Sequence, residues 1–193
     1  MQMGWGRSHL QWMRLANPGA AMKRLPEVGF GPAHGYLYLH VSPRAVAKHL
    51  EWNIAEILGY PVTLNWQPQT LRPGALKAEL SWSSLVGCGS KLASSLKGWH
   101  YLTFEVYESA GATGEGSLYM FTPDLGLFRG TVGTTGDLLI NENQLQSILR
   151  ENLRTSDLAE EIEKLMGKKW DIALEPFRFA RENLELFTDK IPV

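Results

Sequence analysis

The sequence has one cysteine, no long apolar run and almost no net charge. Cys88 is the single cysteine in 193 residues, so an internal disulfide and a thiolate metal cluster are excluded, as suits a reducing compartment. No apolar run approaches the roughly 20 residues of a membrane span. A formal net charge of −1 gives no overall attraction to nucleic acid or to an anionic membrane. We therefore expect a cytoplasmic protein with neither of these as a partner.

Recognised motifs for catalysis and cofactor binding are also missing. The five histidines lack a zinc-ligand spacing such as H-x-x-x-H. The segment "GTVGTTGD", residues 130–137, differs from the dinucleotide-binding fingerprint and follows a predicted antiparallel strand. Ser94 and Lys97 match S-x-x-K without the accompanying signatures. The sequence predicts no catalytic residue, no metal and no cofactor.

Cys88 lies between two glycines in "LVGCGSKLASSLKGWH", residues 85–100, just before a predicted short helix. A helix N-terminus lowers the pKa of a thiol, which favours a nucleophile. A base is also needed, and no motif pairs Cys88 with His40, His49 or His100. We therefore favour a packing role for this cysteine.

The start of the same helix is a candidate anion-binding site. Free N–H groups at a helix N-terminus attract phosphate or carboxylate, and Gly87, Gly89, Ser90 and Lys91 occupy these positions. The spacing differs from a phosphate-binding P-loop. Because glycine is the default residue where a tight turn needs positive φ, turn geometry is the favoured interpretation and a phosphate-bearing ligand is the alternative.

From residue 34 the apolar pattern alternates between strand and helix periods. Strands are predicted at "GYLYLHV", "VTLNW", "ALKAELSW" and "YLTFEVYE". One helix is predicted from Ser42 as N-cap and Pro43 to Gly59, and a second carries Leu92 to Trp99. This order predicts a ferredoxin-like (split βαβ) α+β fold with an antiparallel sheet. "SLYMFT" and "LGLFRGTV" are expected to add two strands.

A C-terminal helical segment is predicted at about residues 141–187. Asn141 and Gln144 are placed as a capping box, and a further helix begins near Asp157 and ends at Gly167. These C-terminal helices are expected to pack on the sheet face that the first two helices leave open. That face carries a polar and aromatic row: Tyr36, Tyr38, His40, Tyr101, Thr103, Glu105 and Tyr107. RNA-recognition motifs stack bases on such a face, but the third strand lacks their signature, so burial by the helices is favoured.

Residues 1–33 are interpreted as an N-terminal arm, and residues 34–193 as a single domain. The arm has no sustained period, and aromatic and basic side chains of the kind that anchor interfaces recur in it. The candidate partner-binding residues are Trp5, Arg7, Trp12, Met13 and Arg14. Docking of the arm on its own domain is the alternative.

Several segments together resemble an uncharacterised actinobacterial family, the domain of unknown function DUF3145. They are "GYLYLHVSPRAVAKHLEW", "LNWQPQ", "AELSW", "SKLASSLKGWHYLTFEV", "YMFTPDLGLF", "GDLLI" and "LEPFRFA". The resemblance covers about residues 35–180, and Cys88 and the arm fall outside the family pattern. It assigns no activity, but it implies an association with fatty-acid metabolism, including acyl-CoA carboxylase.

Three hypotheses of different classes follow, in order of preference. The first is a non-catalytic regulatory or assembly protein that binds a larger enzyme, with acyl-CoA carboxylase implied by the resemblance. The second is a sensor that binds a small phosphate-bearing ligand, a nucleotide or coenzyme A, near Gly89. The third is an enzyme that uses His100 or Asp124.

Overall fold

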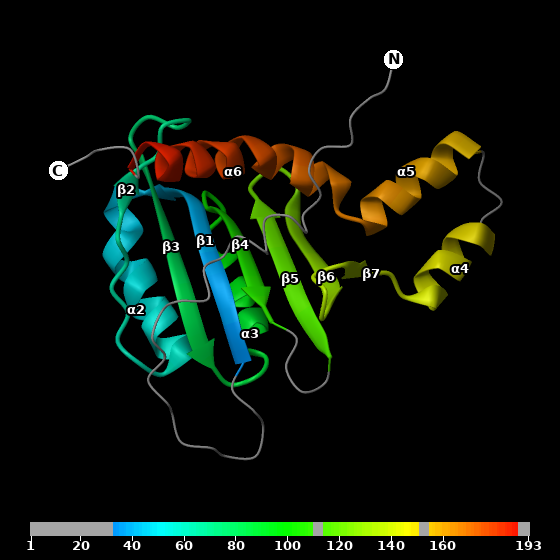
Figure 1. The fold of residues 1–193 in the computed structure, drawn as a ribbon, viewed down its shortest axis with the longest axis horizontal. Helices are drawn as coiled ribbons and strands as arrows, with labels where there is room; N and C mark the ends of the chain where they lie inside the picture. Colours follow the sequence, from blue (N-terminus) through cyan, green and yellow to red (C-terminus); the bar gives the residue numbers. More distant parts are fainter. Residues whose placement is uncertain (1–32, 110–113, 151–154, 189–193) are drawn as a thin grey trace.

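The computed structural model describes residues 33–109, 114–150 and 155–188 (Figure 1). In these ranges seven strands form one antiparallel sheet in the order β2-β3-β1-β4-β5-β6-β7. The strands are β1 (Ala33–Pro43), β2 (Gln67–Pro68), β3 (Ala75–Ser84), β4 (Thr103–Glu108), β5 (Glu115–Thr122), β6 (Gly126–Gly133) and β7 (Leu138–Leu139). The helices are the 3-10 helix η1 (Arg44–Val46), α2 (Ala47–Leu58), α3 (Cys88–Leu96), α4 (Glu142–Arg150), α5 (Thr155–Leu165) and α6 (Lys168–Thr188).

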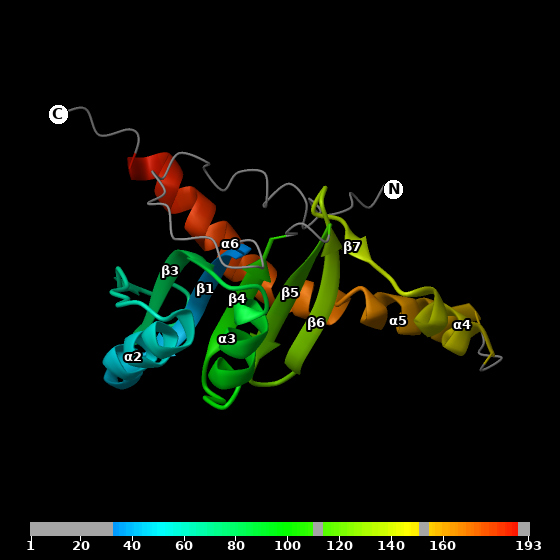
Figure 2. The same ribbon diagram turned by 90° about the horizontal axis from the view of Figure 1, so that it is seen from below.

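The helices lie on both faces of the sheet. Figure 2 shows α2 and α3 on one face and α6 on the other. Because side chains alternate along a strand, each face has its own apolar cluster. The larger one contains Leu37 and Phe104 of the sheet with Ile54 of α2. The smaller one, beneath α6, contains Met120 of β5 and Leu174.

The predicted α+β class with an antiparallel sheet is confirmed, including the two added strands, now β5 and β6. The predicted strand "VTLNW" is wrong: residues 62–66 have no regular structure, and only Gln67–Pro68 pair with β3. The Leu64 N–H and the Trp66 indole instead donate to Glu51 of α2, at 3.1 and 2.9 Å. The Glu51 carboxylate thus accepts a backbone N–H of Leu64 that a strand would donate to its neighbour.

The first helix begins later than predicted. Ser42 is still part of β1, and α2 begins at Ala47 after the turn of η1, with no side-chain cap at Val46. The prediction of Ser42 as N-cap is therefore wrong, since pairing with β3 keeps this residue extended. The predicted end is confirmed, because Gly59 has a φ of 80° and closes the helix on the Ala55 carbonyl.

Of the C-terminal helices, only α6 lies across the sheet, whereas α4 and α5 project beyond its β7 edge (Figures 1 and 2). The prediction that all of the C-terminal helices pack on the sheet is therefore wrong for α4 and α5 and correct for α6. The turn at Gly167, with a φ of 70°, redirects the chain over the sheet only from Lys168 onward. Tyr101 precedes β4 and is 42% exposed, so it does not belong to the buried row.

Candidate functional site

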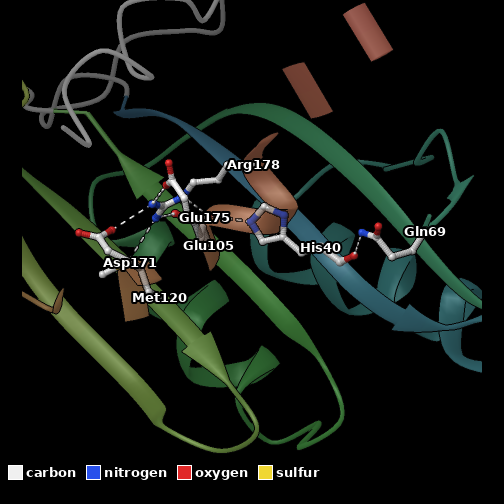
Figure 3. A network of polar contacts seen from close by, with 7 residues as sticks. All are labelled: His40, Gln69, Glu105, Met120, Asp171, Glu175 and Arg178. Atoms are coloured by element: carbon white, nitrogen blue, oxygen red, sulfur yellow. Dashed lines mark hydrogen bonds and ion pairs between the residues drawn. The ribbon is translucent and has the colours of Figure 1, made fainter. Parts of the chain in front are cut away.

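A buried polar cluster joins α6 to the sheet (Figure 3). Arg178 of α6 is only 4% exposed. Its Nη2 donates to Glu105 Oε2 at 2.7 Å, and its Nε donates to Glu105 Oε1 at 3.0 Å. Its Nη1 donates to Asp171 Oδ1 at 3.0 Å, and Asp171 lies seven residues, about two turns, earlier on α6. Glu175 of the same helix lies 3.6 Å from Nη1, so the guanidinium pairs with one carboxylate of the sheet and two of its own helix.

His40 lies on the other side of Glu105. Its Nε2 is 2.7 Å from Glu105 Oε1, and it carries the hydrogen because an ionised carboxylate only accepts. The His40 carbonyl accepts from Gln69 Nε2 at 2.5 Å, and the Phe177 ring centre lies 5.8 Å from the imidazole. The pairing of β1 with β4 shifts register between Leu39 and Val41, which is a bulge at this histidine. His40 is thus fixed by contacts with Glu105, Gln69 and Phe177.

The charges in this cluster stabilise one another. Burial alone raises the pKa of Glu105, but the Arg178 guanidinium and His40 bring that pKa far below its ordinary value. Burial likewise lowers the pKa of Arg178, but Glu105 and Asp171 raise it above its ordinary value. Both groups stay ionised in the folded protein at neutral pH. A general acid needs a raised carboxyl pKa, so this arrangement is suited to anchoring α6 rather than to proton transfer.

We predict that the stabilisation from Glu105 disappears in acid. Because the folded pKa lies below the ordinary 4.5, this stabilisation is present above pH 4.5 and is lost as the pH falls below it. The difference in unfolding free energy between the wild type and Glu105→Gln should shrink below pH 4.5, by up to about 1.4 kcal/mol per pH unit. Urea titrations from pH 7 to pH 2.5 measure this difference, and a pH-independent gap would contradict the assignment.

A second polar arrangement lies at the start of α3. The N–H groups of Gly87 and Gly89 donate to the two carboxylate oxygens of Glu108 in β4, at 2.6 and 2.7 Å. Gly87 has a φ of 88°, as the turn-geometry interpretation requires. A Cβ on Gly89 would lie 2.7 Å from Glu108 Oε2, so the close approach of this carboxylate explains the second glycine.

The donors predicted to hold an anion are thus used by a carboxylate of the same chain. Ser90 follows them inside α3, and Lys91 is exposed beyond it. A phosphate-bearing ligand at this loop would have to displace Glu108 from a helix N-terminus, where a negative charge is stabilised. The sensor hypothesis at this loop stays a prediction, and it requires the ligand to replace the bonds from Gly87 and Gly89 to Glu108.

Cys88 is 3% exposed and lies in the core beneath α2. Its Sγ is 3.3 Å from the Ser84 Oγ and 3.9 Å from the Ile57 carbonyl oxygen. His100 and Asp124 are exposed in turns, and neither side chain bonds to another residue in the described part of the chain. These three candidates for chemistry are not joined to one another by any contact among the described residues.

The family model described as "Protein of unknown function (DUF3145)" matches residues 36–187. The chain belongs to this family. No curated protein and no solved structure matches it. The DUF3145 match begins in β1 and reaches the end of α6, so it includes Glu105, Glu108 and Arg178. The resemblance stated from the sequence is confirmed.

The arm predicted to bind a partner lies outside the residues that the structure describes, and its role stays a prediction. This applies to Trp5, Arg7, Trp12, Met13 and Arg14. Sequence reasoning placed Glu105 on the correct face but missed its partners. The available signal was the spacing of Asp171, Leu174 and Arg178, which puts all three on one face of a helix.

Several apolar side chains are exposed in the part of the chain from β7 to the turn after α5, beyond the edge of the sheet. We call this set the hairpin surface: Leu139, Ile140, Leu145, Leu149 and Met166, which are 37% to 57% exposed. They come from β7, the segment after it, α4 and the turn that follows α5. Ile148 of α4 is the buried member of this helix.

Within the described ranges, none of the helices has the length and apolar character to cross a membrane, and none of the His, Cys, Asp and Glu residues form a metal-binding group.

Proposed function

We propose that this chain is a non-catalytic regulatory or assembly protein that binds a larger enzyme through the hairpin surface. The observation that carries the proposal is the projection of α4 and α5 beyond the sheet with apolar side chains exposed (Figure 1). Leu149 of α4 is 57% exposed. Exposed apolar side chains on a folded domain favour an interaction site when they form a patch.

The charge of the hairpin indicates the chemistry of the partner. Helix α5 carries four acidic side chains and one basic one: Asp157, Glu160, Glu161, Glu163 and Lys164. The complementary surface would be an apolar patch with a basic rim, because charges around an interface set orientation and partner choice. The family resemblance makes an acyl-CoA carboxylase the first enzyme to test.

The buried ionisable groups support a non-catalytic role. Glu105 is paired with Arg178, and Glu108 accepts from two backbone N–H groups. Glu51 accepts from Lys48, from the Leu64 N–H and from Trp66, and these bonds outweigh burial and lower its pKa. Each of these carboxylates has a structural partner that accounts for its position.

We predict that Leu145→Ser combined with Leu149→Ser strongly weakens complex formation. Truncating an interface anchor costs about 2 kcal/mol or more, so the dissociation constant should rise at least about 30-fold. The measurement is calorimetric titration of a purified acyl-CoA carboxylase complex with the full chain. Leu85→Ser is the matched control, because Leu85 is 61% exposed but precedes α3, away from the hairpin.

Two results would overturn the proposal. If the wild-type chain does not bind the carboxylase, this partner is wrong. If the wild-type chain instead forms a dimer that the double variant dissociates, a second copy occupies the hairpin surface in place of an enzyme. Sedimentation velocity of the isolated chain at several concentrations distinguishes that case.

We also infer that β1 to β4 with α2 and α3 form the split βαβ arrangement. The order β2-β3-β1-β4, antiparallel throughout, supports this assignment, as does the location of both helices on one face (Figure 2). Such a fold serves many unrelated functions. The fold therefore indicates no particular activity, and the proposed function depends on the hairpin surface.

A further inference from the structure

We propose that a cavity between the ends of β4 and β5 and the first turns of α6 binds a small organic anion. The ligand would have one carboxylate or phosphate group attached to a short hydrocarbon portion. The cavity has a volume of about 400 Å³ and is lined in part by α6, which lies on the opposite face of the sheet from α3 (Figure 2). This site goes beyond the proposed function, because it does not include the hairpin surface.

Two cationic side chains line this cavity, and Arg72 is the one that favours an anion. Arg72, in the turn between β2 and β3, lines it and forms no ion pair with any described residue. Lys169 of α6 lines it from the other side and forms an ion pair with Glu160 of α5, with 3.1 Å between Nζ and Oε1. Asp124 is the one carboxylate in the lining. Because Glu160 already pairs with Lys169, Arg72 is the lining cation that would pair with the anionic group of the ligand.

Hydroxyl groups in the floor of the cavity supply hydrogen-bond donors. Thr103 is 4% exposed, and its hydroxyl makes no hydrogen bond to another residue in the described ranges. A ligand oxygen in the cavity would accept the proton of this hydroxyl. The Thr122 hydroxyl accepts from the Leu125 N–H at 3.2 Å and still has its own proton to donate.

The remaining lining is apolar and suits the hydrocarbon portion of the ligand. Ile172 of α6 lines the cavity and is 65% exposed. Phe177 and Ala173 continue this wall along the helix. Covering Ile172 with the hydrocarbon portion removes apolar surface from water, which is favourable. A few polar groups that fix orientation beside an apolar wall are typical of ligand sites.

The test uses hexanoate and hexyl phosphate as probes, with hexylamine and 1-hexanol as charge controls. Titration of the full chain, followed by ¹⁵N–¹H correlation spectra, should shift the amides of Thr103, Ile172 and Phe177 with either anion. Hexylamine and 1-hexanol should shift them much less at the same concentration. Binding of only one anion identifies the head group, and either result supports the site.

Two single substitutions locate the binding. Arg72→Gln and the isosteric Thr103→Val should each raise the dissociation constant at least about tenfold. Arg129→Gln, which removes an exposed charge from β6 outside the cavity, should leave it unchanged. Equal binding of hexylamine, unchanged affinity in both variants, or no shift with either anion would overturn the proposal. The Leu145→Ser, Leu149→Ser variant should still bind hexanoate, so this site and the docking proposal fail independently.

Discussion

Replacing Arg178 with methionine should lower the free energy of unfolding by about 3–5 kcal/mol. The substitution leaves Glu105, which is 3% exposed, as a buried carboxylate without its cationic partner. Its bond to His40 would remain, but the two bonds from the guanidinium would be lost. Urea unfolding at pH 7, monitored by circular dichroism, measures the loss.

Arg44→Met is the matched control. Arg44 lies in η1, is exposed, and forms no ion pair with another residue in the described ranges. Its substitution should change the free energy of unfolding by less than about 0.5 kcal/mol. An Arg178→Met variant that is equally stable would show that the buried contact does not hold α6 on the sheet.

A double-mutant cycle isolates the contact between Glu105 and Arg178. Glu105→Gln removes the charge that Arg178→Met leaves unpaired, so the double variant should lose less stability than the sum of the two single variants. Strict additivity would mean that each side chain acts through other neighbours. Asp171 is one such neighbour of Arg178, 3.0 Å away.

The order of helices and strands could be predicted because apolar periodicity is a local property. Leu37 and Leu39 alternate along β1, and Leu50, Ile54 and Leu58 follow the helical repeat of α2. The same rule failed at residues 62–66. Leu64 is buried there as an inward-facing residue, but its N–H bonds to the Glu51 carboxylate, which lies 13 positions earlier.

The candidate site could be predicted only in part, because its contacts join distant positions. Glu105 and Arg178 are 73 positions apart, and no local pattern connects them. The glycines of the α3 turn were recognisable from the sequence. Their carboxylate partner, Glu108, follows Gly89 by 19 positions on another strand. Sequence therefore identified the donors of this turn but not the acceptor that the fold brings to them.

Gly35→Ala should lower the free energy of unfolding by about 3 kcal/mol or more, because overpacking against groups that cannot move is costly. Gly35 lies in β1 between β3 and β4. A Cβ at this position would overlap the Tyr107 carbonyl oxygen and the ring of Trp82. The first is backbone of a central strand, and the second is a large side chain that is 3% exposed. Neither can shift without opening the pairing of β1.

Gly133→Ala tests whether the cost comes from the contact or from the loss of a strand glycine in general. Gly133 ends β6, and a Cβ there would meet only ordinary contacts, the nearest at 3.6 Å from Leu139. This variant should therefore change the free energy of unfolding by less than about 0.5 kcal/mol. Thermal and urea unfolding of both variants provide the comparison. Equal losses would mean that the cost comes from replacing a strand glycine in general and not from the contacts of Gly35 with Tyr107 and Trp82.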